Sequence, residues 1–325
     1  MIISKTPLRV SFVGGGTDLP EFYQDYGGAV LSAAIDKYIY VILKERFDRR
    51  ICINYSRKET VEDVEEIQHE LVREAMRRTG VRDGIEITTL ADIPSEGSGL
   101  GSSSAVTVGL LNALYAYQGQ QQPAERLAQE ACEIEIDTLK KPIGKQDQYI
   151  AAYGGVRLIR FRMAEGVEVI PATVNGGGTR RLADRLLLFF TGRTRRADEI
   201  LTDQRANIPD RIAVLKDMRD QAEDLRERLE AGDLAALGLA LARGWELKKR
   251  LSNRITCDDL DELYARARAA GAVGGKIAGA GGGGFLLLYC EPAQQARVRQ
   301  ALSGLWELEF GLERDGSKII FNIRS

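Results

Sequence analysis

The sequence contains one histidine and only four cysteines. His69 stands in a charged segment with helical spacing, where we expect a solvated position, so histidine-dependent triads and multi-histidine metal sites are excluded. Cys52, Cys132, Cys257 and Cys290 lie far apart and form no C-x-x-C pair. This spacing argues for a reducing compartment and against a cysteine-built zinc site.

The chain also lacks an excess of one charge and any long apolar run. It carries 45 Lys and Arg against 47 Asp and Glu, a net charge of −2, so we expect neither a nucleic-acid partner nor an anionic membrane surface. The longest apolar runs, Leu186–Phe190 and Phe285–Cys290, are far shorter than the roughly 20 residues that cross a bilayer. The opening MIISKTPLRVSF shows no signal-peptide pattern, and we expect a cytoplasmic protein.

A length of 325 residues exceeds what one hydrophobic core usually holds, so we expect two domains. Strands and helices are mixed along the chain, with hairpins, which indicates α+β halves rather than one doubly wound sheet. The glycine-rich segment 175–178 predicts the boundary, with domains at 1–178 and 179–325. Apolar periodicity and turn residues predict strands at 8–13, 29–34, 38–44, 51–55, 84–90, 156–161, 167–170, 186–191, 273–280, 285–290, 307–310 and 318–323, helices at 64–79, 106–117, 123–139, 211–230, 234–251, 258–271 and 292–302, and a short helix ending at 153.

The segment 94–105, PSEGSGLGSSSA, lies between an expected strand and an expected helix. Gly97, Gly99 and Gly101 allow positive φ and a close approach of the backbone to a ligand. The serines at 102–104 supply helix-capping hydroxyls where the first unpaired helix N–H groups occur. Such N–H groups and the helix dipole together form an anion site. A flexible linker is the alternative, but the flanking strand and helix favour a phosphate loop.

Common phosphate motifs do not account for this loop. A Walker A motif requires Gly-Lys-Ser/Thr, and the two Gly-Lys pairs here are followed by Gln146 and Ile277. The segment 279–284 matches G-x-G-x-x-G, but a strand is expected after it, whereas a dinucleotide fingerprint opens a helix. The H-R-D and D-F-G signatures of protein kinases are missing as well.

Three glycine loops stand far apart, at 14–16, 97–101 and 279–284, and each carries polar or capping side chains, which favours convergence on one phosphate-rich ligand. The stretches PLRVSFVGGGTD (7–18), PSEGSGLGSSSA (94–105) and KIAGAGGGG (276–284) resemble, in order, the three motifs of the GHMP kinases, a superfamily that includes galactokinase, homoserine kinase and mevalonate kinase. The resemblance implies a two-domain α+β fold, with a ribosomal S5 domain 2-like N-terminal domain, a ferredoxin-like C-terminal domain and ATP in the cleft between them.

A finer resemblance is to the D-glycero-D-manno-heptose 7-phosphate kinases, through GGGTDLPEFY (14–23), GKQDQY (144–149) and the stretch 276–285. Galactokinase-like members have Gly-Glu-His-Thr-Asp in the first motif, and here Gly15 and Gly16 replace Glu and His. The resemblance implies ATP-dependent phosphorylation of a sugar phosphate at its anomeric hydroxyl, O1, which yields the 1,7-bisphosphate.

The resemblance also implies the catalytic residues. Asp147 occupies the aspartate position of the similar G-x-x-D-Q segment of galactokinase and is the candidate base, with a helix N-cap as the alternative. Arg9 ends the strand of the first motif, where galactokinase-like members carry arginine. Its charge would keep Asp147 ionised and neutralise the transferred phosphoryl group, and an exposed strand arginine is the alternative.

ATP would bind the phosphate loop, and Mg²⁺ would bind beside it. The residues implied for ATP are Pro94, Glu96, Gly97, Ser98, Gly99, Leu100, Gly101, Ser102, Ser103 and Ser104. The implied Mg²⁺ ligands are Ser103 and a glutamate of the helix at 123–139, where Glu135 fits better than Glu133 and the choice stays open. Alternatively, Ser103 and this glutamate could both be solvated helix residues.

The acceptor would lie against the other two glycine loops. Asp18 matches the sugar-binding aspartate of the family, with a turn-forming aspartate as the alternative. A distal phosphate would need cations, for which Arg193, Arg195 and Arg196 or Lys248 and Lys249 are candidates, although such clusters also occur on plain surfaces. The expected substrate-binding set is Gly15, Gly16, Thr17, Asp18, Arg193, Arg196, Lys276, Gly281 and Gly282.

Other functions stay open at this stage. The acceptor of such a kinase could be fucose, a uronic acid or an octose phosphate, and the scaffold could serve as a catalytically silent sugar or nucleotide sensor. A hydride-transfer enzyme is a further alternative. We expect ATP and a sugar phosphate as partners, and the sequence leaves the oligomeric state open.

Overall fold

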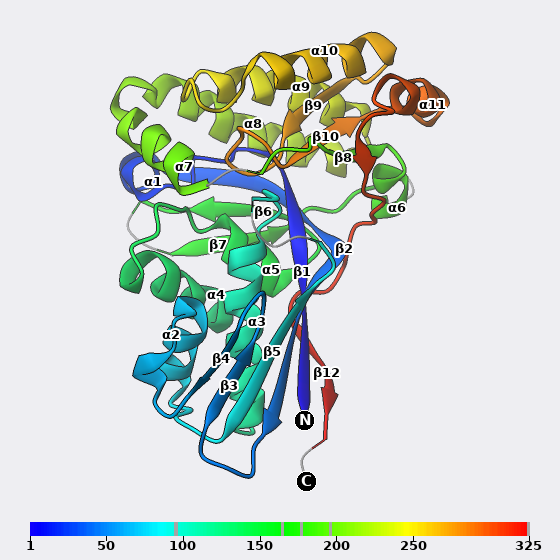
Figure 1. Cartoon of the computed structure of the whole chain (residues 1–325). Helices are drawn as coiled ribbons and strands as arrows, with labels where there is room; N and C mark the ends of the chain where they lie inside the picture. The colour runs from blue at the N-terminus through cyan, green and yellow to red at the C-terminus, as the bar shows by residue number, and fades with distance from the viewer. Residues whose placement is uncertain (94–96, 164–165, 176–177, 195–196, 324–325) are drawn as a thin grey trace.

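The computed structural model describes residues 1–93, 97–163, 166–175, 178–194 and 197–323, and the strands of these residues form two sheets (Figure 1). The larger sheet has the order β12-β1-β2-β5-β3-β4, with β6 pairing with both β2 and β7, and the smaller sheet has the order β11-β8-β10-β9. The larger sheet consists of β1 (Ile2–Val13), β2 (Gly28–Glu45), β3 (Ile51–Asn54), β4 (Lys58–Val61), β5 (Ile85–Ala91), β6 (Val156–Phe161), β7 (Val167–Pro171) and β12 (Lys318–Asn322). The smaller consists of β8 (Leu186–Phe190), β9 (Gly274–Ile277), β10 (Phe285–Tyr289) and β11 (Trp306–Glu307).

Strand β2 is the centre of the larger sheet. It pairs with β1 along most of its length, while residues 28–33 pair with β6 and residues 39–45 pair with β5. The separate strands expected at 29–34 and 38–44 are one continuous strand, and β1 accommodates its length through a register shift between Pro7 and Leu8.

Helices pack on β1 and β2 from both sides in the view of Figure 1. Helices α3 (Ser102–Tyr117) and α5 (Gln146–Tyr153) pack from below, and α8 (Ile212–Glu230) and α9 (Ala235–Lys249) pack from above. Residues 28–35 of β2 are all buried, as expected for a strand with both faces covered.

Helix α3 lies unusually close to β1 because Gly109 has no side chain. A Cβ at Gly109 would lie 2.9 Å from Oγ1 of Thr6, and Oγ of Ser4 donates a hydrogen bond to the Gly109 carbonyl at 2.9 Å. This contact fixes the start of α3, and therefore the phosphate loop before it, relative to β1.

The helix expected at 64–79 is interrupted, and His69 lies at the interruption. A short 3₁₀ turn at Val64–Glu66 is followed by α2 at Glu70–Thr79, because the Glu59 carboxylate accepts hydrogen bonds from the backbone N–H groups of Gln68 and His69 at 2.7 and 3.1 Å. The expectation of a solvated helix face for His69 is wrong. Its half-buried ring meets Tyr55 edge-on, at 4.7 Å between ring centroids.

The remaining helices include several that periodicity alone did not indicate. The helix expected at 123–139 is α4 (Ala124–Cys132) followed by a π-helix (Glu133–Thr138). Helices α10 (Asp258–Ala270) and α11 (Pro292–Ala301) are close to their expected ranges. Unexpected are α1 (Pro20–Tyr26), α6 (Gly178–Ala183), α7 (Ala197–Ala206) and a 3₁₀ turn (Ile208–Asp210).

The C-terminal strand returns to the first half of the chain. β12 pairs with β1, whereas β8 to β11 form the smaller sheet. Because strands from both predicted domains share the larger sheet, the domain boundary at 178/179 stays a prediction.

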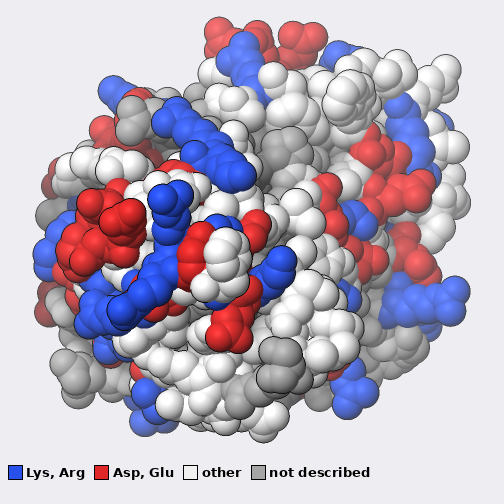
Figure 2. Space-filling view, turned by 60° about the horizontal axis from the view of Figure 1, so that its bottom comes forward, with Lys and Arg blue, Asp and Glu red and all other residues white. Residues whose placement is uncertain are grey.

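Figure 2 shows acidic and basic side chains interspersed on the face in view. Within the described ranges, no helix combines the length and the apolar character that a bilayer crossing demands.

Two glycine loops contact each other backbone to backbone. A Cβ at Gly99 would lie 2.6 Å from the Ala278 carbonyl oxygen, and one at Gly279 would lie 2.7 Å from the Gly99 carbonyl oxygen. Gly99 and Gly279 also have φ of +76° and +67°, in the region that favours glycine. The loop before α3 and the loop between β9 and β10 therefore meet only because neither carries a side chain here.

Gly279→Ala should lower the free energy of unfolding by roughly 1–3 kcal/mol, because the new Cβ combines an unfavourable φ with a clash against backbone. Urea denaturation of the purified protein measures this loss. The matched control is Gly304→Ala, where a Cβ meets nothing within 4 Å and which should be close to neutral. Equal effects of the two substitutions would contradict the close approach of the loops.

Candidate active site

The phosphate loop leads directly into α3. The helix begins at Ser102, and its N-cap is Gly101 in the left-handed conformation, with φ 79° and ψ 24° and no side-chain cap hydrogen bond. The expectation that the serines cap the helix with their hydroxyls is therefore wrong, since Ser102–Ser104 form its first turn. The N–H groups of that turn have no partner within the helix, which leaves them for an anion.

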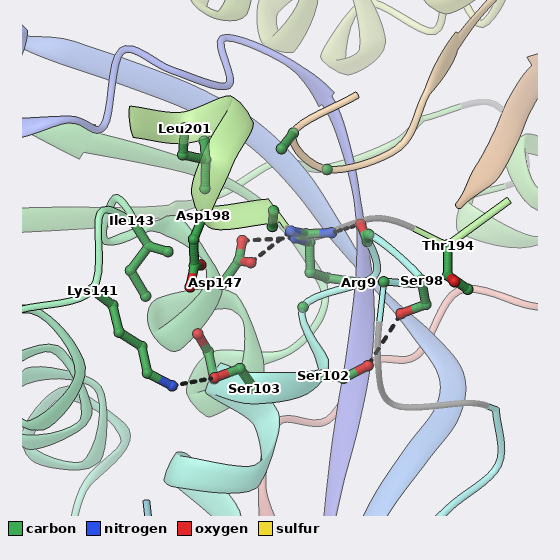
Figure 3. Close-up of a pocket in the computed structure, with 17 residues that line it drawn as sticks. Arg9, Ser98, Ser102, Ser103, Lys141, Ile143, Asp147, Thr194, Asp198 and Leu201 are labelled. Atoms are coloured by element: carbon green, nitrogen blue, oxygen red, sulfur yellow. Dashed lines mark hydrogen bonds and ion pairs between the residues drawn. The ribbon is translucent and has the colours of Figure 1, made fainter. Parts of the chain in front are cut away.

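A cleft of about 660 Å³ opens over this helix start (Figure 3). Its walls come from the phosphate loop, from the segment before α5, from α7 and from the loop between β9 and β10. The lining residues are Arg9, Gly97, Ser98, Gly99, Gly101, Ser102, Ser103, Ser104, Lys141, Ile143, Asp147, Thr194, Ala197, Asp198, Leu201, Gly279 and Ala280. The expected ATP residues 97–99 and 101–104 thus line one space, while Pro94 and Glu96 lie outside the described residues.

A smaller cavity of about 70 Å³ adjoins the cleft. It is lined by the first glycine loop, by the start of α5, and by α7 and α9. The residues are Arg9, Ser11, Gly15, Gly16, Asp18, Leu19, Ile143, Gly144, Gln146, Asp147, Leu201, Gln204, Lys248, Gly279 and Ala280. Arg9 and Asp147 line both spaces, so the cleft and the smaller cavity meet at this pair.

Arg9 and Asp147 form a bidentate ion pair. Nε and Nη2 of Arg9 donate to the two carboxylate oxygens of Asp147 at 2.7 and 2.5 Å, and Nη1 donates to the Gly99 carbonyl at 2.6 Å. Arg9 is 5% exposed, which removes the alternative of a surface arginine. Asp147 lies in the first turn of α5, whose N-cap is Lys145, so Asp147 is not the N-cap.

Glu135 faces the phosphate loop from the π-helix. Ser103 Oγ donates to one Glu135 carboxylate oxygen at 2.6 Å, and Gln148 Nε2 donates to the other at 2.8 Å. The carboxylate is fully buried, and burial raises the pKa of Glu135 above its usual value, against the opposing charge of Lys141. Glu133 is exposed and pairs with Arg78, so geometry favours Glu135 of the two glutamates.

Asp18 lies at the bottom of the smaller cavity. Its Oδ1 accepts from the Gly16 N–H at 2.9 Å, and its Oδ2 accepts from the backbone N and Nε2 of Gln146 at 3.3 and 3.0 Å. Burial raises the pKa of Asp18, and the nearby charge of Asp147 adds to the rise. The hydrogen bond from Gly16 is of the turn-forming kind, but Asp18 also accepts a bond from Gln146, which lines the same cavity.

Several expected substrate residues have structural partners instead. Thr17 Oγ1 donates to the Gly14 carbonyl at 2.8 Å, and the Gly282 N–H donates to the Ile255 carbonyl at 2.7 Å. A Cβ at Gly281 would meet the same Ile255 carbonyl, so this glycine lies against it as well. The substrate-binding role of Thr17, Gly281 and Gly282 stays a prediction that the cavity linings do not support.

The candidate cations are distributed unevenly. Lys276 is buried and lines neither space: its Nζ donates to the carbonyls of Ser11 and Phe12 at 2.9 and 3.3 Å, and burial lowers its pKa well below the usual value. Lys248 lines the smaller cavity, and its Nζ donates to the Gly279 carbonyl at 2.5 Å.

Of the other candidate cations, the two that the structure describes, Lys249 and Arg193, line neither space. Lys249 pairs with Glu246 on the surface of α9, and Arg193 pairs with Asp259. Arg195 and Arg196 lie outside the described residues.

The cavity residues that the sequence did not assign to the site include Ser11, Lys141, Gln146 and Gln204. Lys141 Nζ lies 3.3 Å from Ser103 Oγ and pairs with Glu70 at 3.0 Å. Gln146 stands inside the motif GKQDQY, so its place beside Asp147 was a usable signal. Gln204 lies on a helix that the sequence did not indicate, and no motif marks it.

Comparison with known proteins identifies the family. The family model "GHMP kinases N terminal domain" matches residues 66–155, and the model "GHMP kinases C terminal" matches residues 222–308. The D-glycero-alpha-D-manno-heptose 7-phosphate kinase of Campylobacter jejuni subsp. jejuni serotype O:2 is 30% identical over 318 residues, which cover 93% of this chain and 93% of that protein.

Two further relatives extend the comparison. The bifunctional fucokinase/GDP-fucose pyrophosphorylase of Arabidopsis thaliana is 28% identical over 91% of this chain, and the match spans 30% of that larger protein. The crystal structure of a D-glycero-D-manno-heptose 1-phosphate kinase from Bacteriodes thetaiotaomicron has a TM-score of 0.83 at 28% identity, with 100% of both chains covered. The resemblance of the three glycine loops is thereby confirmed, and the chain belongs to the GHMP kinases, with the α+β fold of that family.

Proposed function

We propose that this GHMP kinase transfers the γ-phosphoryl group of ATP to O1 of D-glycero-α-D-manno-heptose 7-phosphate, which yields the 1,7-bisphosphate and ADP. The observation that carries the proposal is the junction of two spaces at Arg9 and Asp147. The larger has the helix N-terminus and glycine loop of a triphosphate site, and the smaller has the buried carboxylate and amides that suit a sugar.

Asp147, Arg9 and the first turn of α3 have different roles in the proposed reaction. Asp147 accepts the proton of the acceptor hydroxyl as its oxygen attacks the γ-phosphorus, and ADP leaves on the opposite side. Arg9 orients the Asp147 carboxylate through two hydrogen bonds and brings positive charge to the place where the phosphoryl group passes. The first turn of α3 holds the phosphates with its N–H groups.

The residues beside the loop fit a magnesium ion. Ser103 Oγ and Glu135 are in direct contact, so one ion could bind both, and a fully buried carboxylate with a raised pKa gains from a nearby cation. A serine and one carboxylate are enough protein ligands for Mg²⁺, since it keeps water and phosphate oxygens as its other ligands. When bound, Mg²⁺ would neutralise charge on the triphosphate.

The choice of acceptor rests on the relatives and on the smaller cavity. The names of the C. jejuni and B. thetaiotaomicron relatives both specify a heptose, and they differ in the position of its phosphate. Lys248, which is 5% exposed and lines the smaller cavity, is the described cation best placed for a distal phosphate. The relation to a fucokinase makes fucose the second candidate acceptor.

Asp147→Asn should lower kcat by about 10²–10⁴-fold, because the amide cannot accept the acceptor proton. Coupled ADP release measures kcat, and calorimetry measures ATP binding, which should persist. The comparison variant is Asp198→Asn, since Asp198 lines only the larger cleft and should matter much less. Wild-type turnover by Asp147→Asn would remove it as the base.

Asp18→Asn should change how stability depends on pH. Burial raises the folded-state pKa of Asp18 above 3.8, so the folded protein binds this proton more tightly than the unfolded chain does. The contribution of Asp18 to the free energy of unfolding therefore falls as the pH rises from about 4. The unfolding free energy of the variant relative to wild type should therefore increase between pH 4 and 7, while the KM for the acceptor rises. A difference that stays constant over this range would contradict a buried, ionisable Asp18.

A screen of ADP release over candidate acceptors tests the substrate. D-glycero-D-manno-heptose 7-phosphate should give the highest kcat/KM, the unphosphorylated heptose a lower value, and fucose, uronic acids and octose phosphates lower values still. A preference for fucose would replace the proposed acceptor. Tight ATP binding without ADP formation from any acceptor would favour a catalytically silent sensor.

A further inference from the structure

Three buried polar atoms at the smaller cavity have no hydrogen-bond partner in the described part of the chain. They are Oγ of Ser11, Oε1 of Gln146 and Nε2 of Gln204, and all three side chains line this one space. A buried polar group without a partner is costly, and most such groups in proteins are satisfied. Three together at one cavity indicate a ligand that supplies their partners.

The chemistry of these atoms specifies what that ligand offers. All three groups are neutral: the amide oxygen accepts, the amide nitrogen donates, and the serine hydroxyl does either, so together they match hydroxyls, which both donate and accept. Phosphate and carboxylate groups call for cations or backbone N–H groups instead. The back of the smaller cavity therefore suits the hydroxyls of a polyol.

Gln204 is the member of this set that comes from the second half of the chain. It is 2% exposed on α7, and its amide packs on the first glycine loop, where a Cβ at Gly16 would lie 2.3 Å from Nε2. Gly16 thus leaves room for the Gln204 amide as well as adopting φ +107°. Neither a larger residue at 16 nor a shorter one at 204 preserves this contact.

Helix α7 is held in place on both sides of Gln204. Arg205 pairs with Glu21 of α1, which lies beside α7 in Figure 1. The Asp203 carboxylate accepts hydrogen bonds from Ser252 and Asn207. Helix α7, and with it the backbone of Gln204, is therefore held in position before any ligand binds, as a selective contact requires.

Two other buried glutamines differ from Gln204 in their amide nitrogens. Nε2 of Gln221 donates to the Ala240 carbonyl at 2.9 Å and Nε2 of Gln148 donates to Glu135 at 2.8 Å, although Oε1 of each has no partner among the described residues. Gln204 is buried as deeply, yet its Nε2 has no partner among the described residues. It also lines the smaller cavity and not the larger cleft, so it faces the acceptor side alone.

We propose that Gln204 is a specificity-determining residue, whose side-chain amide donates a hydrogen bond to a hydroxyl of the phosphoryl acceptor. Ser11 and Gln146 bind neighbouring hydroxyls of the same molecule. The inference rests on the proposed sugar-kinase function and deepens it, because it assigns recognition of the acceptor's hydroxyls to a helix outside the three glycine motifs.

The test is Gln204→Met, which keeps the length of the side chain and removes its N–H groups. The KM for D-glycero-D-manno-heptose 7-phosphate should rise about tenfold or more, because the sugar hydroxyl loses its donor. The KM for ATP and kcat should change little. A series of monodeoxy heptose phosphates should contain one member with which variant and wild type perform alike, since that sugar lacks the matched hydroxyl.

The matched control is Gln221→Met, a buried amide on α8 that lines neither cavity and should leave the acceptor KM unchanged. If Gln204→Met no longer binds ATP, Gln204→Glu replaces it, which keeps an oxygen and loses the donor. An acceptor KM equal to wild type in a folded variant overturns the inference. A uniform loss across the whole deoxy series does so too, because it would indicate a structural role.

A wrong assignment of the acceptor gives a different experimental result from a wrong assignment of Gln204. If wild type prefers another sugar, the same variants are measured with that sugar, and a selective rise in its KM supports Gln204 while the heptose assignment falls. If wild type phosphorylates no acceptor, both the proposed function and this inference are overturned.

Discussion

The Arg9 guanidinium holds together the three segments on which the site depends. Its side chain bonds both Asp147 oxygens at the start of α5 and the Gly99 carbonyl in the phosphate loop, while its backbone N–H donates to the Leu100 carbonyl at 3.0 Å. A Cβ at Gly101 would lie 3.1 Å from Cγ of Arg9, so the loop must be glycine there to pass so near. The buried Arg9 side chain therefore lines both cavities.

The region of the site contains three buried ionisable side chains, whose burial costs stability. Glu135 and Asp18 are buried carboxylates with raised pKa values, and Lys276 is a buried amine with a lowered one. For each of these three groups, the loss of hydration on burial disfavours the charged form by more than the neighbouring charges and hydrogen bonds favour it. Ligands that bring the opposite charge or suitable hydrogen bonds offset this cost, which ties the stability of the region to what it binds.

The sequence predicted those parts of the site that local chemistry determines. The strand before the phosphate loop and the glycines within it follow from local residues, whereas the family resemblance implied Ser103 and a glutamate as metal ligands, with Glu135 fitting better than Glu133. Contacts between distant segments decided the rest. Glu59 interrupts the helix before His69, and α7 is fixed by Glu21 and by Ser252 of the α9–α10 connection, so Gln204 had no local signal.

The most direct test of the central claim is a crystal structure of the ternary complex with a non-hydrolysable ATP analogue, Mg²⁺ and heptose 7-phosphate. We expect the triphosphate to lie along the first turn of α3 and the sugar to fill the smaller cavity, with O1 and the γ-phosphorus meeting beside the Asp147 carboxylate. A sugar bound outside the smaller cavity, or a γ-phosphate remote from Arg9 and Asp147, would contradict it.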